Sequence, residues 1–327
     1  MGMAARAASR SRWPHRLAVV TAATTLLLIF VGGLVTNTGS ALAVPDWPTT
    51  FGYNMFLYPW SKMVGGIFYE HSHRLIGSTV GLLTVALAIS LWLAEPRKWV
   101  RALGLVAVVA VIIQGVLGGM RVVLLNHPLA IFHACLAQAF FALLVSLAVA
   151  TSGFWEHAAE QPRLLDAPRL RSMALTTVAL VYVQVVWGAL LTHTGTRLDT
   201  HLLFAGLVTG AVGLLAVRIL SRHADRTELR RPALLLMALL VAQLGLGLGV
   251  YLWRFTSLNV AMDPALGLAF QAMHRIIGTA VLGAAMMLAM RVVRFAAMSR
   301  IVTAADSVTA RRLAGSLGAD RSREVLA

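Results

Sequence analysis

The chain has 327 residues, of which 58% are hydrophobic and only 13% are charged, and its mean hydropathy is +0.77. This composition excludes a soluble globular domain, whose polar surface must cover its core, and it indicates an all-α polytopic membrane protein. The 28 Lys and Arg against 13 Asp and Glu give a net charge of +15. Because no nucleic-acid-binding motif accompanies this charge, it indicates contact with anionic membrane lipid and not with nucleic acid.

Apolar runs long enough to cross a bilayer occur eight times along the chain. A crossing needs about 20 helical residues, and the runs that provide them are residues 17–35, 67–93, 102–120, 129–150, 173–191, 200–220, 233–253 and 266–292. The sequence therefore predicts eight transmembrane helices. The first outer loop, residues 36–66, contains prolines, glycines and aromatic residues suited to the membrane interface. After about residue 293 the chain turns polar and arginine-rich, and we expect it to end in a mobile tail.

Basic residues fall mainly on one side of the predicted membrane. They precede the first span, follow each even-numbered span and continue after the eighth, whereas the opposite loops hold only Lys62, Arg121, Arg197 and Arg254. The positive-inside rule then places both termini in the cytoplasm. A bacterial inner membrane is the expected location, and the basic, serine-containing segment before the first span leaves a mitochondrial transit peptide as the alternative. The single cysteine, Cys135, excludes an intramolecular disulfide.

Two parts of the chain four helices apart are similar to each other. The first span ends in GGLVTNTGS and the fifth in WGALLTHTGT, and the third and seventh spans carry the corresponding glutamines Gln114 and Gln243. An even number of helices per repeat relates two units by an axis along the membrane normal. We therefore expect eight transmembrane helices arranged as two parallel-repeat four-helix bundles, residues 1–155 and 156–300, followed by a cytoplasmic tail, residues 301–327.

Histidines stand near the start of every even-numbered span. His73, His133, His201 and His274 occupy spans two, four, six and eight, so each predicted half contributes two histidines from two helices. Two imidazoles from opposing helices of a four-helix bundle can hold a haem iron axially, and the pattern predicts two haem sites. The alternative is that each histidine bonds only a carbonyl or a lipid headgroup. A zinc site is disfavoured because it needs three or four converging ligands.

Charged residues beside these histidines distinguish the two halves. Glu70 is the one acidic residue within a predicted span, three residues before His73 on the same helix face. The second half has no counterpart, so we expect the first half to perform chemistry and the second to hold a haem. Arg74 and Arg275 each follow a histidine, where a guanidinium can pair with a haem propionate. Snorkelling to the outer interface is the alternative for both arginines.

The motifs that carry these residues resemble those of the haem A synthase family. They are GGLVTNTGSALAVPDWPTTFGYN, EHSHRLIG in the second span, IFHACLAQ in the fourth and MHRIIG in the eighth. The resemblance extends over roughly residues 17–292 and implies oxidation of the C8 methyl of haem O to a formyl group, giving haem A for cytochrome oxidase.

The resemblance also implies roles for individual residues. His73 and His133 would hold the substrate haem, Glu70 would assist catalysis, and His201 and His274 would ligate a resident haem b, with iron as the metal that all four histidines bind. Haem O synthase and cytochrome oxidase assembly factors are the implied partners.

The first outer loop departs from the pattern of that family. Many bacterial members carry two cysteines there, whereas this chain has Val44 and Thr50 around PDWP, which removes any thiol-based redox step from the loop. Two other functions stay open: a bis-histidine dihaem electron-transfer protein, which gives Glu70 no special purpose, and a non-enzymatic haem-delivery assembly factor. A transporter is disfavoured because the spans show no clear breaks or midplane charges. A homo-oligomer also stays open.

Overall fold

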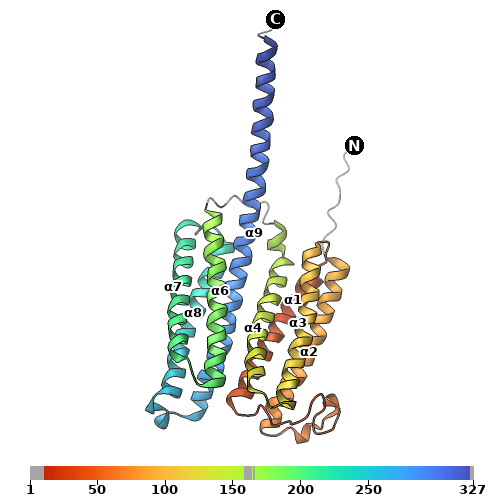
Figure 1. The fold of residues 1–327 in the computed structure, drawn as a ribbon, viewed down its shortest axis with the longest axis vertical. Coiled ribbons are helices and arrows are strands. Elements are labelled where there is room, and N and C mark those ends of the chain that lie inside the picture. Colours follow the sequence, from red (N-terminus) through yellow and green to blue (C-terminus); the bar gives the residue numbers. More distant parts are fainter. Residues whose placement is uncertain (1–10, 158–163, 165, 325–327) are drawn as a thin grey trace.

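The computed structural model describes residues 11–157, 164 and 166–324. Within this part of the chain, eight helices are long and apolar enough to cross a membrane (Figure 1). They are α1 (Trp13–Asn37), α2 (Gly66–Ala94), α3 (Lys98–Val123), α4 (His127–Ala150), α6 (Ala167–Thr194), α7 (Leu198–Arg222), α8 (Thr227–Phe255) and α9 (Pro264–Glu324). The connections hold α5 (Gly153–His157) and the 3-10 helices η1 (Met55–Leu57), η2 (Trp60–Lys62) and η4 (Ser257–Ala261). The predicted all-α architecture with eight spans is confirmed.

Local sequence signals set several helix boundaries. Proline occupies the first turn of α1, α4 and α6, where its missing N–H group costs no helical hydrogen bond. The side chain of Asn126 caps α4 by accepting a hydrogen bond from the N–H of Leu129 at 3.2 Å. After α6 the backbone turns at Gly195, whose φ of 71° is a left-handed conformation that glycine adopts at little cost.

The eight long helices form two groups of four, α1–α4 and α6–α9 (Figure 1). One apolar core lies among α1–α4 and includes Leu87 and Leu144, and the other lies mainly among α6–α9 and includes Leu215 and Leu288. The groups meet where α9 packs against α1 and α4 and where α4 packs against α6. A hydrogen bond of 3.0 Å from Gln138 Nε2 to Thr279 Oγ1 joins α4 to α9. The parallel relation between the two groups stays a prediction.

The start of α1 and the end of α9 lie at the same end of the bundle, and the loop between α1 and α2 lies at the opposite end (Figure 1). This loop contains η1, η2 and an isolated β-bridge between Thr50 and Tyr53. An even number of crossings requires both ends of the chain to emerge on one side, and the assignment of that side to the cytoplasm stays a prediction.

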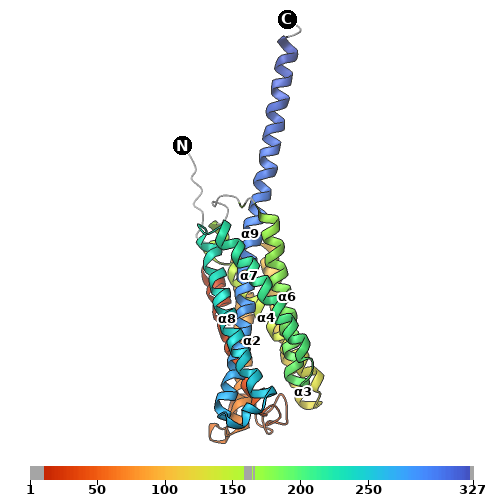
Figure 2. The ribbon, with the colours of Figure 1, turned by 90° about the vertical axis from the view of Figure 1, so that its left-hand side faces the viewer.

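The described part of the C-terminal tail, expected to be mobile over its last twenty residues, is helical. α9 continues as one helix to Glu324 and extends far beyond the other helices (Figure 2). The reason is local propensity: residues 301–324 contain no proline and are rich in alanine and arginine, which are strong helix formers. The change to polar residues after about residue 293 shows where the apolar part of α9 ends, but it does not show where the helix itself ends.

Candidate haem sites

The four histidines of the even-numbered spans come together as two pairs. His73 of α2 lies opposite His133 of α4 with 6.5 Å between the ring centroids, and His201 of α7 lies opposite His274 of α9 at 6.4 Å. Each pair belongs to one four-helix group, and its two rings are steeply inclined, at 74° and 67°. The structure thus places two histidines from two helices in each group, which is the arrangement that the spacing predicts.

Each of these imidazole rings lies against a glycine of the preceding long helix. A β-carbon built on Gly32, Gly118, Gly188 or Gly247 would lie 2.8, 3.1, 3.3 or 3.0 Å from Cε1 of His73, His133, His201 or His274, respectively. At Gly32 and Gly118 the Cε1 and Nδ1 atoms of the facing histidine are nearer than Nε2, so Nε2 is the ring nitrogen farthest from that helix. The absence of a side chain at these positions lets the rings approach closely.

A glutamine precedes three of the four glycines by one helical turn. In the first group, Gln114 Nε2 donates to the carbonyl of His133 at 2.8 Å, and His133 Nδ1 lies 3.1 Å from the carbonyl oxygen of Gln114. That carbonyl can only accept, so Nδ1 carries the proton and Nε2 keeps its lone pair. In the second group, Gln184 and Gln243 instead place their amide nitrogens 3.4 and 3.3 Å from Nε2 of His201 and His274.

The fourth position, on α1, is Leu28, whose side chain has no hydrogen-bonding group. One helical turn before the facing glycine, His73 therefore has an apolar residue, whereas His133, His201 and His274 each have an amide. The first pair thus has one leucine and one glutamine at these positions and the second pair has two glutamines, so the two pairs differ chemically even without Glu70.

The geometry of both pairs fits axial ligation of a haem iron. Two imidazoles that each bind one metal ion through a nitrogen about 2 Å away have ring centroids roughly 6 to 6.5 Å apart, and the observed separations of 6.5 and 6.4 Å agree. Within the described residues, Nδ1 of His73, His201 and His274 and Oε1 of the three glutamines are buried without a hydrogen-bond partner. Each pair would hold the iron of one haem.

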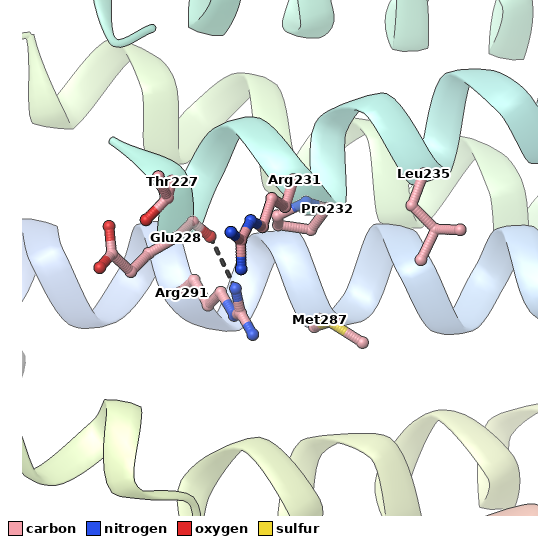
Figure 3. Close-up of a pocket in the computed structure, with 7 residues that line it drawn as sticks. All are labelled: Thr227, Glu228, Arg231, Pro232, Leu235, Met287 and Arg291. Carbon is pink, nitrogen blue, oxygen red and sulfur yellow. Dashed lines mark hydrogen bonds between the residues drawn. The ribbon is translucent and has the colours of Figure 1, made fainter. Parts of the chain in front are cut away.

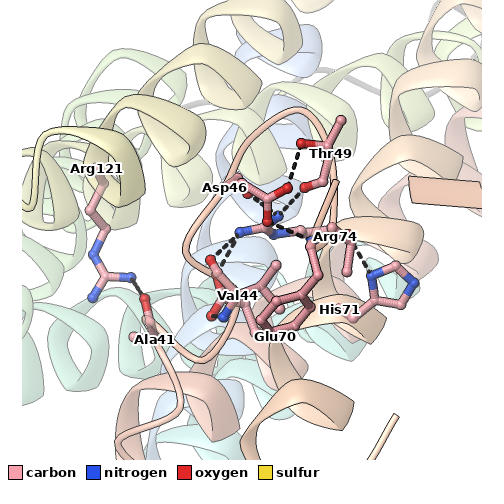
Figure 4. Close-up of polar contacts among 10 residues, drawn as sticks. Ala41, Val44, Asp46, Thr49, Glu70, His71, Arg74 and Arg121 are labelled. Atoms are coloured by element: carbon pink, nitrogen blue, oxygen red, sulfur yellow. Dashed lines mark hydrogen bonds and ion pairs between the residues drawn. The ribbon is translucent and has the colours of Figure 1, made fainter. Parts of the chain in front are cut away.

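Glu70 lies on α2 beside the first pair, and both of its carboxylate oxygens accept a hydrogen bond (Figure 4). The residue is only 4% exposed. Its Oε1 accepts a hydrogen bond from Arg74 Nη2 at 2.8 Å, and its Oε2 accepts one from the N–H of Val44 at 3.0 Å. Because Val44 belongs to the loop between α1 and α2, the carboxylate connects α2 to that loop.

Arg74 makes most of its contacts with the same loop. Its Nη1 donates to the carbonyl oxygens of Asp46 and Thr49 at 2.7 and 3.0 Å, and its Nη2 donates to that of Val44 at 2.9 Å (Figure 4). With the bond to Glu70, the guanidinium makes four hydrogen bonds. Arg74 therefore fastens the loop in this structure, and its predicted contact with a haem propionate stays a prediction.

Further contacts hold the loop against the beginning of α2 and the end of α3. His71, only 1% exposed, places Nδ1 3.1 Å from Thr50 Oγ1, and Trp47 lies on α3, where a β-carbon added to Gly119 would be 2.2 Å from its ring. Arg121 of α3 donates to the carbonyl of Ala41 at 3.2 Å (Figure 4). We call residues 41–53 the cap segment. It covers the end of the first group near which His73 and His133 lie.

Asp46 stabilises the cap segment from within. Its carboxylate accepts hydrogen bonds from the N–H groups of Phe51 and Gly52, at 2.7 and 2.9 Å, and from the hydroxyl of Thr49. Burial works to raise the pKa of Asp46, but the hydrogen bonds from Gly52, Thr49 and Phe51 outweigh it, so its pKa lies below the usual value. The ionised form of Asp46 is therefore the one that suits the folded loop.

Arg275, which follows His274 on α9, reaches the other helix group. A β-carbon on Gly33 of α1 would lie 3.0 Å from Arg275 Nη1, and Nη2 lies 3.4 Å from Asn37 Oδ1. Gly33 is adjacent to Gly32, the glycine under His73. Arg275 thus lies between the two histidine pairs, and its predicted contact with a haem propionate stays a prediction.

Sequence reasoning missed the glycines on which the histidine rings lie. The common GxxxG spacing does not mark them: in the GxxxG pairs of α2, α3 and α8, a β-carbon on Gly81, Gly115 or Gly245 would meet nothing within 4 Å, one on Gly77 would meet only a side-chain atom at 3.9 Å, and one on Gly119 or Gly249 would meet the ring of Trp47 or Phe270. A usable signal was the spacing Gln-x-x-x-Gly, which occurs at 114–118, 184–188 and 243–247 on α3, α6 and α8.

The fold and the site together define a polytopic helical membrane protein with two half-buried histidine pairs, one in each helix group. The model of the COX15-CtaA family, described as cytochrome oxidase assembly protein, matches residues 15–201, and the chain belongs to this family. The match contains Glu70, His73 and His133 and ends at His201, so that His274 lies outside it.

Curated relatives carry the name heme A synthase. The chain is 31% identical to that of Shouchella clausii over 189 residues, 29% identical to that of Halalkalibacterium halodurans over 176 residues, and 36% identical to that of Alkalihalophilus pseudofirmus over 108 residues. These matches cover 56%, 52% and 32% of this chain. They span 60%, 56% and 35% of the length of the three relatives.

Proposed function

We propose that this protein is a haem A synthase, which oxidises the C8 methyl group of haem O to a formyl group and so provides haem A for cytochrome oxidase. The observation that carries the proposal is the presence of two half-buried histidine pairs at 6.5 and 6.4 Å, of which the first has a buried carboxylate, Glu70, on a histidine-bearing helix, whereas Asp199, two residues before His201, is exposed. Membership of the cytochrome oxidase assembly family and the name of the relatives support it.

The two histidine pairs have different roles in this proposal. His73 and His133 hold the substrate haem O in the group that carries Glu70, and His201 and His274 hold a resident haem b. Iron supplies the redox chemistry, since no side chain is an oxidant strong enough to attack a methyl C–H bond. The second pair has the amides of Gln184 and Gln243 beside it, whereas Leu28 beside the first pair leaves one face of that pocket apolar.

The protein's own groups orient the substrate and exclude water. The carbonyl of Gln114 fixes the proton of His133 on Nδ1, which presents Nε2 to the pocket. The cap segment covers the end of the pocket through Trp47 and through the carbonyl groups that Arg74 binds. Each oxygen of Glu70 accepts one hydrogen bond, and loss of its negative charge would weaken the ion pair with Arg74. Proton transfer at Glu70 would therefore change how the cap segment is held.

The proposed setting is a bacterial inner membrane, with both termini in the cytoplasm and the cap segment on the outer side. The basic loops support this orientation, and the start of α1 and the end of α9 lie on one side of the bundle (Figure 1). Haem O synthase, as the source of the substrate, and cytochrome oxidase assembly factors, as the recipients of haem A, are the proposed partners.

The experiment that tests the function compares Glu70→Gln with the wild type in cells that also make haem O. We expect Glu70→Gln to retain haem b and to lose most haem A, because the carboxylate is needed in the substrate half only. Glu95→Gln is the matched control: Glu95 lies just after the other end of α2, is also 4% exposed and is paired with Arg97 at 2.7 Å. Wild-type haem A production by a well-folded Glu70→Gln variant would remove Glu70 from the mechanism.

A bis-histidine dihaem electron-transfer protein is the second candidate. The observation that favours it is that Arg74 and the N–H of Val44 each donate to one oxygen of the Glu70 carboxylate, which gives this residue a structural purpose without any chemistry. This candidate predicts that the wild type yields haem b and no haem A, so haem extraction separates the two functions.

A further inference from the structure

A cavity of about 340 Å³ lies far from the histidine pairs, between the first turns of α8 and the facing part of α9 (Figure 3). Arg231, Leu235 and Glu228 line it from α8, and Met287 and Arg291 line it from α9. It lies at the end of the bundle where α1 begins and where the sequence predicts the basic cytoplasmic face. Neither the haem sites nor the cap segment uses these residues.

Arg291 is held at this cavity by a backbone carbonyl of α8 that lacks its usual helical hydrogen bond. In a regular helix the carbonyl of Glu228 would accept the N–H of residue 232, but Pro232 has no N–H group. Arg291 Nη1 donates to this carbonyl instead, at 2.8 Å (Figure 3). The Nε atom of Arg291 is buried and has no partner among the described residues. The guanidinium is thus held in place with donor capacity left over.

A second guanidinium faces the same space. Arg231 reaches between α8 and α9 (Figure 3), and it is exposed. Glu228 also lines the cavity, but Figure 3 shows its carboxylate pointing away from both guanidinium groups. Two arginines and one glutamate leave a net charge of +1, which the positive end of the 29-residue helix α8 reinforces.

We propose that this cavity binds the phosphate group of a membrane phospholipid. A phosphate diester offers several acceptor oxygens to two guanidinium groups, which are the donors best suited to phosphate. Leu235, 46% exposed, and Met287 continue the cavity as an apolar surface along α8 and α9, where an acyl chain would lie. A free phosphate ion would use only the arginines. The bound lipid joins α8 to α9, the helix that carries His274.

The proposal is tested by native mass spectrometry of the detergent-purified full chain titrated with dioleoylphosphatidylglycerol. Arg231→Gln removes one guanidinium from the cavity. Arg230→Gln is the matched control, because Arg230 is the preceding residue, is exposed and does not line the cavity. We expect Arg231→Gln to weaken lipid binding about tenfold, as the loss of a charged hydrogen bond would, and Arg230→Gln to leave it unchanged. Equal weakening in both variants would overturn the site, because it would indicate only general surface charge.

Arg291 needs a different design, since Arg291→Gln alone would also leave the carbonyl of Glu228 without a donor. Pro232→Ala restores an N–H group at residue 232 and frees Arg291 from that structural task. Compared with Pro232→Ala, the double variant Pro232→Ala/Arg291→Gln should bind the lipid about tenfold more weakly. Unchanged lipid binding in the double variant would contradict the proposal.

Inorganic phosphate separates a lipid site from a simple anion site. Leu235→Ser should weaken binding of the lipid and leave binding of phosphate as it is, because only the lipid uses the apolar part of the cavity. If millimolar phosphate displaces the lipid completely and Leu235→Ser has no effect, the cavity is an anion site and the lipid proposal is wrong.

Discussion

Gly247→Ala should reduce the haem b content of the protein through one added carbon atom. The new β-carbon would lie 3.0 Å from Cε1 and 3.5 Å from Nδ1 of His274, so the ring must shift by a few tenths of an ångström out of its position opposite His201. Crowding of this kind costs about 1–3 kcal/mol, which corresponds to roughly 5- to 150-fold weaker haem binding. We expect a lower haem-to-protein ratio after pigment extraction and a weaker low-spin spectrum.

Gly245→Ala is the control for this variant. Gly245 lies two residues away on the same helix, and its β-carbon would meet nothing within 4 Å. Both substitutions gain the same helix preference of about 1 kcal/mol, so the difference between them isolates the contact with His274. Equal haem content in the two variants would refute the inference that the glycine contact positions this ligand.

Four further outcomes are expected. Arg74→Gln should speed proteolysis of the cap segment while haem b is retained, because three hydrogen bonds to loop carbonyls are lost; unchanged cleavage would show that other contacts suffice. Arg275→Gln should shift the reduction potential of haem b, since a buried cation beside His274 is removed, and an unchanged potential would place Arg275 away from the haem. Asp46 has a lowered pKa, so its contribution is complete at neutral pH and is lost as the pH falls below about 4; the cap segment of the wild type, but not that of Asp46→Asn, should then become more sensitive to an acid protease. A topology reporter after Arg226 should read as cytoplasmic and one near Thr50 as outer, and the reverse result would invert the orientation.

Hydropathy and histidine spacing were sufficient to predict the eight helices and the four histidines. Both are properties of single helices: an apolar run must be long enough for the bilayer, and His73, His133, His201 and His274 recur at the same depth in alternate spans. The sequence could not show which surfaces of neighbouring helices meet. The glycines under the rings, such as Gly247, were therefore missed, although they control how closely each ring approaches its neighbour.

The role of Glu70 was only partly visible for the same reason. A lone carboxylate in a span marks a functional position, but its bonds to Arg74 and to the N–H of Val44 depend on how a long loop folds back onto α2. The sequence offered haem propionates as a partner for Arg74, whereas the structure has loop carbonyls in contact with it. The folding of a long loop is set by tertiary contacts that no local pattern records.

The central claim is tested most directly by identifying the haems bound to the purified wild-type protein after expression together with haem O synthase. The account predicts haem b from the His201–His274 pair together with haem O or haem A from the His73–His133 pair. Haem b alone, in a protein that folds and keeps its low-spin spectrum, would contradict the account and identify a dihaem electron-transfer protein instead.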